Sequence, residues 1–84
     1  MNRQSKRSKS LPKLHPAKPE KIVRALERLG FVRIRQSGSH AVFRHPDGRW
    51  ATVPIHKGRD ISVGLLHKIL KDADVTVEEF EEMR

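Results

Sequence analysis

An imidazole beside a tight turn on a basic surface is the part of this sequence best suited to chemistry. His40 directly follows Ser37-Gly38-Ser39. An unperturbed imidazole titrates at about 6.5, so it can accept or donate a proton near neutral pH. Positioned proton transfer accelerates a reaction by roughly a hundredfold to ten-thousandfold. At an RNA phosphate, we expect His40 to act as general base on a ribose 2′-hydroxyl or to protonate the leaving 5′-oxygen. Considered alone, a single strand histidine is more often a hydrogen-bonded surface or packing residue.

Two further histidines follow in the same basic region. His45 precedes a proline in His45-Pro46-Asp47-Gly48, a sequence typical of a hairpin turn, so its main role is expected to be turn formation. His56 ends the segment Val53-Pro54-Ile55-His56 and is a candidate accessory acid or phosphate contact. The spacing of the three histidines offers no Cys ligand, no His-x-His pair and no helical His pair. We therefore predict metal-independent chemistry with no cofactor.

Hydroxyl, amide and cationic groups around His40 are candidate phosphate contacts. Ser37 and Ser39, with the Gly38 backbone amide, can donate hydrogen bonds to a phosphate as a small anion nest, although their simpler role is turn formation. The cationic candidates lie on the predicted strands and in the segment after them: Arg33, Arg35, Arg44, Arg49, Lys57 and Arg59. A basic strand face is usually only solvated, but a neighbouring general base favours phosphate contact. Trp50 can stack on a base, yet a core or partner-interface role is preferred for the one Trp of a small domain.

The charge of the chain points to a phosphate-bearing partner. It carries 18 Lys and Arg against 10 Asp and Glu, a formal net charge of +8 over 84 residues. Residues 1–18 include six basic residues, no acidic residue and few apolar ones, so we expect a disordered basic tail there. Residues 19–84 are expected to form one small domain with a modest core.

The sequence contains no recognisable export signal or membrane span. No apolar stretch of the required length follows the charges of the tail, and no apolar run is long enough to cross a bilayer. The chain has no cysteine, which agrees with a reducing compartment. We expect a cytoplasmic protein that does not associate with membranes.

Hydropathy patterns predict the elements that position His40. A first amphipathic helix is indicated by apolar residues at helical spacing between Pro19 and Gly30. Alternation then predicts strands over residues 31–36, 40–45 and 50–55, joined by short turns. In the first strand, Val32 and Ile34 are expected to face inward and Arg33 and Arg35 outward.

Two helices are predicted after the strands. Ser62 is a good N-cap for an amphipathic helix whose apolar residues are Leu65, Leu66, Ile69 and Leu70. Thr76-Val77-Glu78-Glu79 has the capping-box pattern and predicts a short third helix to Glu82. The expected fold class is α+β in the order α-β-β-β-α, with a three-stranded antiparallel sheet, both main helices on one face and the other face available to a ligand.

Several linked motifs resemble the HicA toxins of bacterial toxin-antitoxin systems. The similarity covers roughly residues 19–80 and is carried by these segments: Leu29-Gly30-Phe31, Gln36-Ser37-Gly38-Ser39-His40, Phe43-Arg44-His45-Pro46-Asp47-Gly48-Arg49, Val53-Pro54-Ile55-His56 and Gly64-Leu65-Leu66-His67-Lys68-Ile69-Leu70-Lys71-Asp72-Ala73. The sequence departs from many relatives at three positions. Ala41 replaces a second histidine, Leu65 replaces a Thr, and Asp74 replaces a Gly. The first departure counts against a mechanism that uses two adjacent histidines.

The resemblance implies a double-stranded-RNA-binding-domain-like fold and an mRNA interferase activity that depends on His40. It also implies a HicB-type antitoxin that binds the toxin and masks its active site, and it is compatible with a heterotetramer or a larger complex. The residues alone are also compatible with two other functions. One is a non-catalytic basic RNA-binding module of the same fold, and the other is an interaction protein that acts only with its partner, for example in DNA-bound autoregulation.

Overall fold

The chain folds into one layer of helices against a small sheet. The computed structural model describes residues 14–56 and 58–83; the remainder of the predicted tail, Lys57 and Arg84 lie outside the described residues. The elements follow in the order α2 (Pro19–Arg28), β1 (Val32–Ser37), β2 (His40–Arg44), β3 (Trp50–Pro54), α3 (Val63–Asp72) and α4 (Val77–Met83). The predicted α-β-β-β-α fold, with a short C-terminal helix, is confirmed.

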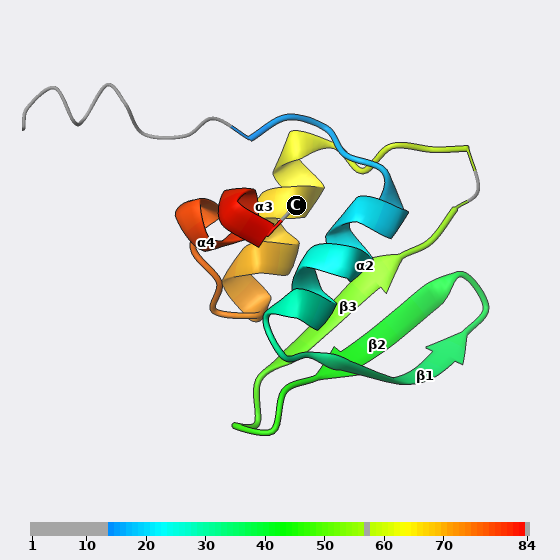
Figure 1. Cartoon of the computed structure of the whole chain (residues 1–84). Helices are drawn as coiled ribbons and strands as arrows, with labels where there is room; N and C mark the ends of the chain where they lie inside the picture. Colours follow the sequence, from blue (N-terminus) through cyan, green and yellow to red (C-terminus); the bar gives the residue numbers. More distant parts are fainter. Residues whose placement is uncertain (1–13, 57, 84) are drawn as a thin grey trace, which may run out of the picture.

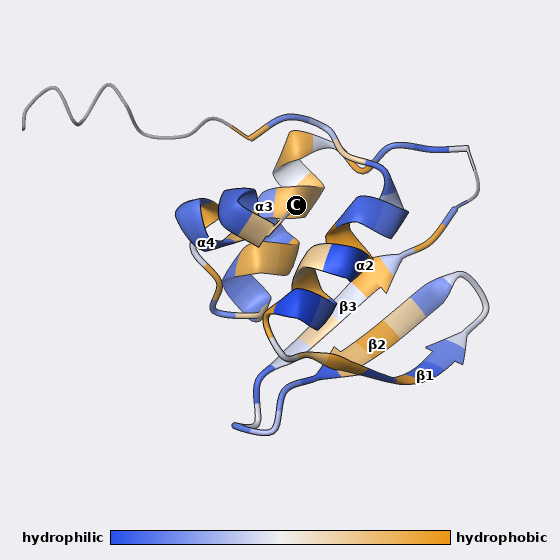
Figure 2. Ribbon diagram, viewed as in Figure 1, coloured by the Kyte–Doolittle hydropathy of each residue, from blue (hydrophilic) through white to orange (hydrophobic). Residues whose placement is uncertain are grey.

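The three strands form an antiparallel meander in the spatial order β1-β2-β3 (Figure 1). Alternate residues of the second and third strands, Ala41 and Phe43 of β2 with Ala51 and Val53 of β3, are buried. They pack with apolar residues of α2, α3 and α4 in one core that includes Ile22, Leu26, Phe31, Leu66, Ile69 and Phe80. Figure 2 shows hydrophobic residues on the helix surfaces that face the sheet. His40, Val42 and Arg44 alternate with the buried residues of β2 and therefore lie on the opposite, outer face.

Helix termini are stabilised as their sequences predict. Gly30 adopts a φ of +100° after α2, and the backbone N–H groups of Gly30 and Phe31 donate to carbonyls of the last turn. The Ser62 hydroxyl accepts a hydrogen bond from the Leu65 backbone N–H at the start of α3. Thr76 and Glu79 form a reciprocal capping box before α4, with distances of 3.0 and 2.9 Å. These caps fix the ends of the helices that surround the sheet.

The packed part of the chain begins before the predicted domain boundary at Pro19. The backbone of Ala17 pairs with that of Ile61 through two hydrogen bonds of 3.1 and 2.7 Å. Both side chains are buried in the core. The segment from Leu14 to Lys18 thus holds the loop before α3 against the body of the fold.

The first strand departs from its predicted orientation. Val32 and Ile34, which were expected to face inward, are 57% and 47% exposed, whereas Arg33 pairs with Phe43 and lies over its ring at 5.4 Å. The register shifts between Arg33 and Arg35, so this β-bulge returns Arg35 to the outer face opposite Val42. Of the two edge strands, β3 packs against α2 and α3, whereas no residue of β1 belongs to the core cluster. A shift of one residue reverses the faces of a strand.

No helix within the described residues has both the length and the apolar character that crossing a membrane requires.

Candidate functional site

A two-residue hairpin loop places His40 at one end of the outer sheet face. Ser37 ends β1 and pairs directly with His40, and Gly38 occupies the first loop position with a φ of +59°. Glycine is favoured there because positive φ costs it little. The Ser39 carbonyl accepts a hydrogen bond from the Ile55 backbone N–H, which ties the loop to the end of β3. His40 is exposed, and no hydrogen bond or ion pair engages its imidazole within the described residues.

A hollow of about 470 Å³ brings His40 and His56 together. It lies between the outer face of the strands and the segment that leads into α3. Its polar lining includes Arg59, Asp60 and Ser62 as well as the two histidines. The two imidazoles, which are 16 positions apart in the sequence, therefore face one volume large enough for a nucleotide unit, together with a guanidinium group.

A second hollow, of about 310 Å³, continues from His40 along α3. Its lining comes from β3 and one side of the helix: Thr52, Pro54, Leu65, Lys68, Ile69 and Asp72. Leu65 was predicted to belong to the apolar core face of this helix, but it is 37% exposed and lines both hollows. No sequence motif points to a function for Lys68, Thr52 or Leu65, because only the packing of α3 beside β3 brings them to His40.

The predicted phosphate contacts separate into those near His40 and those far from it. Ser37 pairs with His40, and Arg35 is on the outer face opposite Val42, two positions along β2. Arg44 is on the same face at the far end of β2, about 13 Å from His40 at the usual rise of a strand. Arg59 lines the hollow that contains His40. Lys57 lies outside the described residues.

Arg49 is engaged within the fold. Its Nη1 donates to the carbonyl oxygens of Ala73 and Asp74 at 3.2 and 3.1 Å, and its Nε donates to Asp47 Oδ2 at 2.8 Å. The guanidinium also lies over the Phe31 ring at 5.2 Å. These contacts link the β2–β3 turn to the end of α3, so Arg49, a predicted phosphate contact, lies at the opposite end of the sheet from His40.

His45 and Asp47 form the turn itself. His45 Nδ1 accepts the Asp47 backbone N–H at 3.1 Å, and the ring meets Phe31 edge-on at 5.2 Å. The backbone N–H of Arg49, followed by its guanidinium and the nearby His45, lowers the pKa of the Asp47 carboxyl below its ordinary value of 3.8 despite some desolvation. The imidazole also packs against Gly30, where an added Cβ would lie 2.8 Å from Nε2. His45 is thus a packing residue of the turn.

Exposed apolar side chains gather on the outer face near this turn. Trp50 is 47% exposed, with the Arg44 guanidinium 5.2 Å from its ring. Val32, Ile34 and Arg44 line a shallow depression beside it. Trp50 is therefore outside the core, and of its sequence-based alternatives only the surface roles remain.

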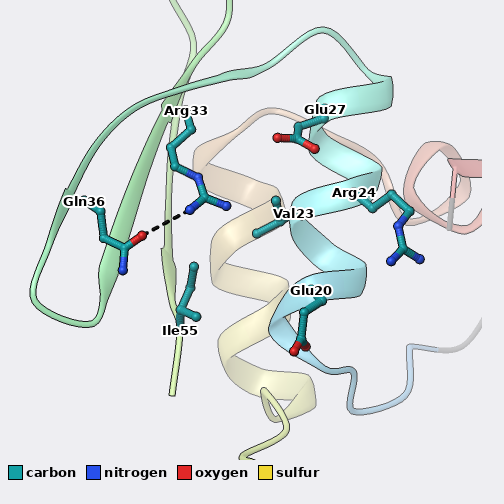
Figure 3. Close-up of a pocket in the computed structure, with 7 residues that line it drawn as sticks. All are labelled: Glu20, Val23, Arg24, Glu27, Arg33, Gln36 and Ile55. Atoms are coloured by element: carbon teal, nitrogen blue, oxygen red, sulfur yellow. Dashed lines mark hydrogen bonds between the residues drawn. The ribbon is translucent and has the colours of Figure 1, made fainter. Parts of the chain in front are cut away.

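Another hollow, of about 310 Å³, opens between α2 and β1 (Figure 3). Its wall includes Glu20 and Glu27 of α2, and Arg33 and Gln36 of β1, the last two joined by a hydrogen bond of 3.1 Å. Its lining carries two carboxylates and two guanidinium groups, those of Arg24 and Arg33, so charge alone does not distinguish it from the hollows at His40. The hollow contains no imidazole. We therefore assign the candidate site to the hollows that share His40. Across the described residues, no three His, Cys, Asp or Glu side chains are grouped so that they could hold a metal ion.

Comparison with protein families gives one match. A family model described as the HicA toxin of bacterial toxin-antitoxin systems matches residues 19–75, from the start of α2 to just after α3. The chain belongs to the HicA toxin family. The matched region of this HicA chain contains all three strands, α2, and α3, the helix that borders the His40 hollows. It is a toxin of a toxin-antitoxin system, and an antitoxin is its expected counterpart. No curated protein matches the sequence.

Proposed function

We propose that this HicA-family toxin is an endoribonuclease that cleaves mRNA without a metal ion and so inhibits translation. The observation that carries the proposal is the position of His40, which lies exposed where two hollows meet and has no competing contact among the described side chains. A catalytic imidazole must be accessible to the proton that it transfers. Family membership independently supports a toxic activity.

The proposed reaction is a transesterification at an RNA phosphate. His40 removes the proton of a ribose 2′-hydroxyl, or protonates the leaving group, as the 2′-oxygen attacks phosphorus and the bond to the 5′-oxygen breaks. The products are a 2′,3′-cyclic phosphate and a 5′-hydroxyl. His56 lines the same hollow and is proposed as the accessory residue for the complementary proton transfer. Arg59 lines the same hollow and is proposed to stabilise negative charge that develops on the phosphate oxygens.

The test is incubation of purified protein and its His40→Ala variant with RNA, with and without excess chelator. We expect cleavage by the parent in both conditions, with cyclic phosphate ends, and none above background by the variant. Products with 5′-phosphate ends would instead indicate attack by an activated water. Undiminished binding of RNA without any cleavage by the parent would indicate a non-catalytic RNA-binding module.

The proposed partner is a HicB-type antitoxin that covers the His40 hollows in the cytoplasm, in a heterotetramer or larger complex. Because the His40 imidazole is accessible, the antitoxin must block access of RNA to it in order to keep the toxin inactive. The prediction is that the purified complex leaves RNA intact and that degradation of the antitoxin restores cleavage. The mass of the complex in solution measures its stoichiometry.

A further inference from the structure

The two hollows that meet at His40 form one trough along α3. Both are lined by His40, Pro54 and Leu65, so the three side chains stand at the junction. The first hollow reaches Ser62 at the N-terminus of α3, and the second reaches Lys68. At a rise of about 1.5 Å per residue, this stretch of helix measures about 9 Å. The trough thus extends on both sides of His40, the proposed reacting group.

Each arm of the trough contains one cation and one carboxylate. Arg59 lines the first arm, and its side chain has no hydrogen bond or ion pair within the described residues. Asp60 lines the same arm, and its carboxylate is 3.5 Å from Lys18 Nζ. Lys68 lines the second arm, where its Nζ is 3.2 Å from Asp72 Oδ2. Because the side chains of this pair are 70% and 55% exposed, water and salt screen their attraction. A phosphate can therefore compete with Asp72 for the ammonium group.

We propose that a single RNA strand lies along α3 in this trough, with Lys68 binding a backbone phosphate on one side of the cleavage point and Arg59 binding one on the other. This inference rests on the proposed endoribonuclease function and adds the path of its substrate. Pro54 and Leu65 form the apolar wall beside His40, against which a base or ribose packs. Lys68 is a positioning residue, since it holds the strand while His40 transfers the proton.

Substitution of Asp72 also tests the proposed path, because it should change RNA affinity in the opposite direction to substitution of Lys68. Its carboxylate lines the same arm as Lys68, so it repels a phosphate there and also competes for the ammonium group. Removing the charge of Lys68 should weaken RNA binding, and removing the charge of Asp72 should strengthen it. If the pair served only to stabilise the helix, breaking it from either side would affect stability and leave RNA affinity alone.

The experiment measures binding of a fluorescently labelled single-stranded RNA by anisotropy. The full chain carries His40→Ala, so that the probe stays intact, and the salt concentration is varied. Lys68→Gln should weaken binding about threefold to tenfold. It should also make the slope of log affinity against log salt shallower by about 0.7, the value for one phosphate contact to a single strand. Asp72→Asn should bind more tightly, and Lys68→Arg should bind as the parent does.

The matched control is Lys71→Gln, which removes the same charge from the same helix at an exposed position outside both hollows. It should change affinity by less than twofold. Equal effects of Lys68→Gln and Lys71→Gln, or weaker binding by Asp72→Asn, would overturn the proposed path. The same substitutions in the active protein separate the two proposals. If the parent cleaves RNA and Lys68→Gln raises its KM no more than Lys71→Gln, the path is wrong and the nuclease function stands. If the parent does not cleave, the function fails.

Discussion

Both ends of the sheet carry histidine and arginine side chains, but within the described part of the chain these side chains are hydrogen-bonded at one end and without partners at the other. At the β2–β3 turn, His45, Asp47 and Arg49 are joined to one another and to the end of α3. At the β1–β2 turn, the imidazole of His40 has no such partner within the described residues, and neither has the guanidinium of Arg59. Polar groups that satisfy one another stabilise the fold, whereas groups without internal partners are available to a ligand. The residue types alone do not separate these roles.

The largest expected effect is loss of cleavage in His40→Ala. Removing a positioned proton-transfer group should lower the rate of RNA cleavage by roughly a hundredfold to ten-thousandfold. Stability should change little, since the side chain is exposed. Single-turnover rates with thermal unfolding of the same samples measure both quantities. His67→Ala, at an exposed site on α3, is the control and should cleave at the parental rate. A reversal of these two results would remove the distinction between the two ends of the sheet.

Arg49→Ala should destabilise the protein and leave the chemistry intact. The guanidinium donates to the Ala73 and Asp74 carbonyls and to Asp47 from a side chain that is only 28% exposed. Loss of these charge-assisted hydrogen bonds should lower the free energy of unfolding by about 2 kcal/mol. Urea denaturation measures the change. Arg24→Ala, on the exposed side of α2, should cost far less. A selective loss of RNA affinity at unchanged stability would restore Arg49 as a phosphate contact.

Gly30→Ala should also destabilise the turn end of the sheet. The φ of +100° disfavours any residue with a Cβ, and that Cβ would lie 2.8 Å from His45 Nε2. A cost of roughly 1–2 kcal/mol in unfolding free energy is expected from the backbone alone. Gly64→Ala is the matched control because its Cβ meets nothing within 4 Å in a helix, where alanine is the better residue.

Replacing a residue by glycine at the end of α3 should stabilise the fold. Asp74 is the one non-glycine residue with positive φ among the described residues, at +55°. Asp74→Gly should therefore raise the free energy of unfolding by up to about 1 kcal/mol. If Gly30→Ala proved neutral while Asp74→Gly destabilised, side-chain contacts would outweigh backbone conformation at both helix ends.

The smallest expected effect is a pH dependence from Asp47. Its pKa is lowered in the folded state, chiefly by the hydrogen bond from the Arg49 backbone N–H. The charged carboxylate therefore stabilises the fold above the ordinary pKa of 3.8, and the contribution is lost as the pH falls through the lowered folded value. Asp47→Asn should be less stable than the parent near neutral pH, and the difference should shrink below about pH 4. A constant difference down to pH 2 would contradict this.

Much of the fold follows from local signals. The α2 helix is specified by apolar spacing with Pro19 and Gly30, the second hairpin by Pro46-Asp47-Gly48, and α4 by its capping box. The orientation of β1 is the main failure. The alternation of Val32 with Arg33 predicts a strand but does not say which of its two faces is buried. The bulge after Arg33 then changes the register. Which face of β1 lies toward the helices is decided by the packing of the sheet and by this bulge, and the strand's own alternation does not encode it.

For the candidate site, the sequence determined the chemistry available: an imidazole after a glycine turn, a basic charge and no cysteine. It also carried the motifs of the HicA family. Only the tertiary structure decided which polar residues act together. The packing of α3 beside β3 brought His56, Arg59 and Lys68 to the hollows around His40, and the end of α3 engaged Arg49 at the opposite end of the sheet. The physical reason is that turns and helices form from contacts between near neighbours, whereas a site is formed by residues that only the packing of the core brings together.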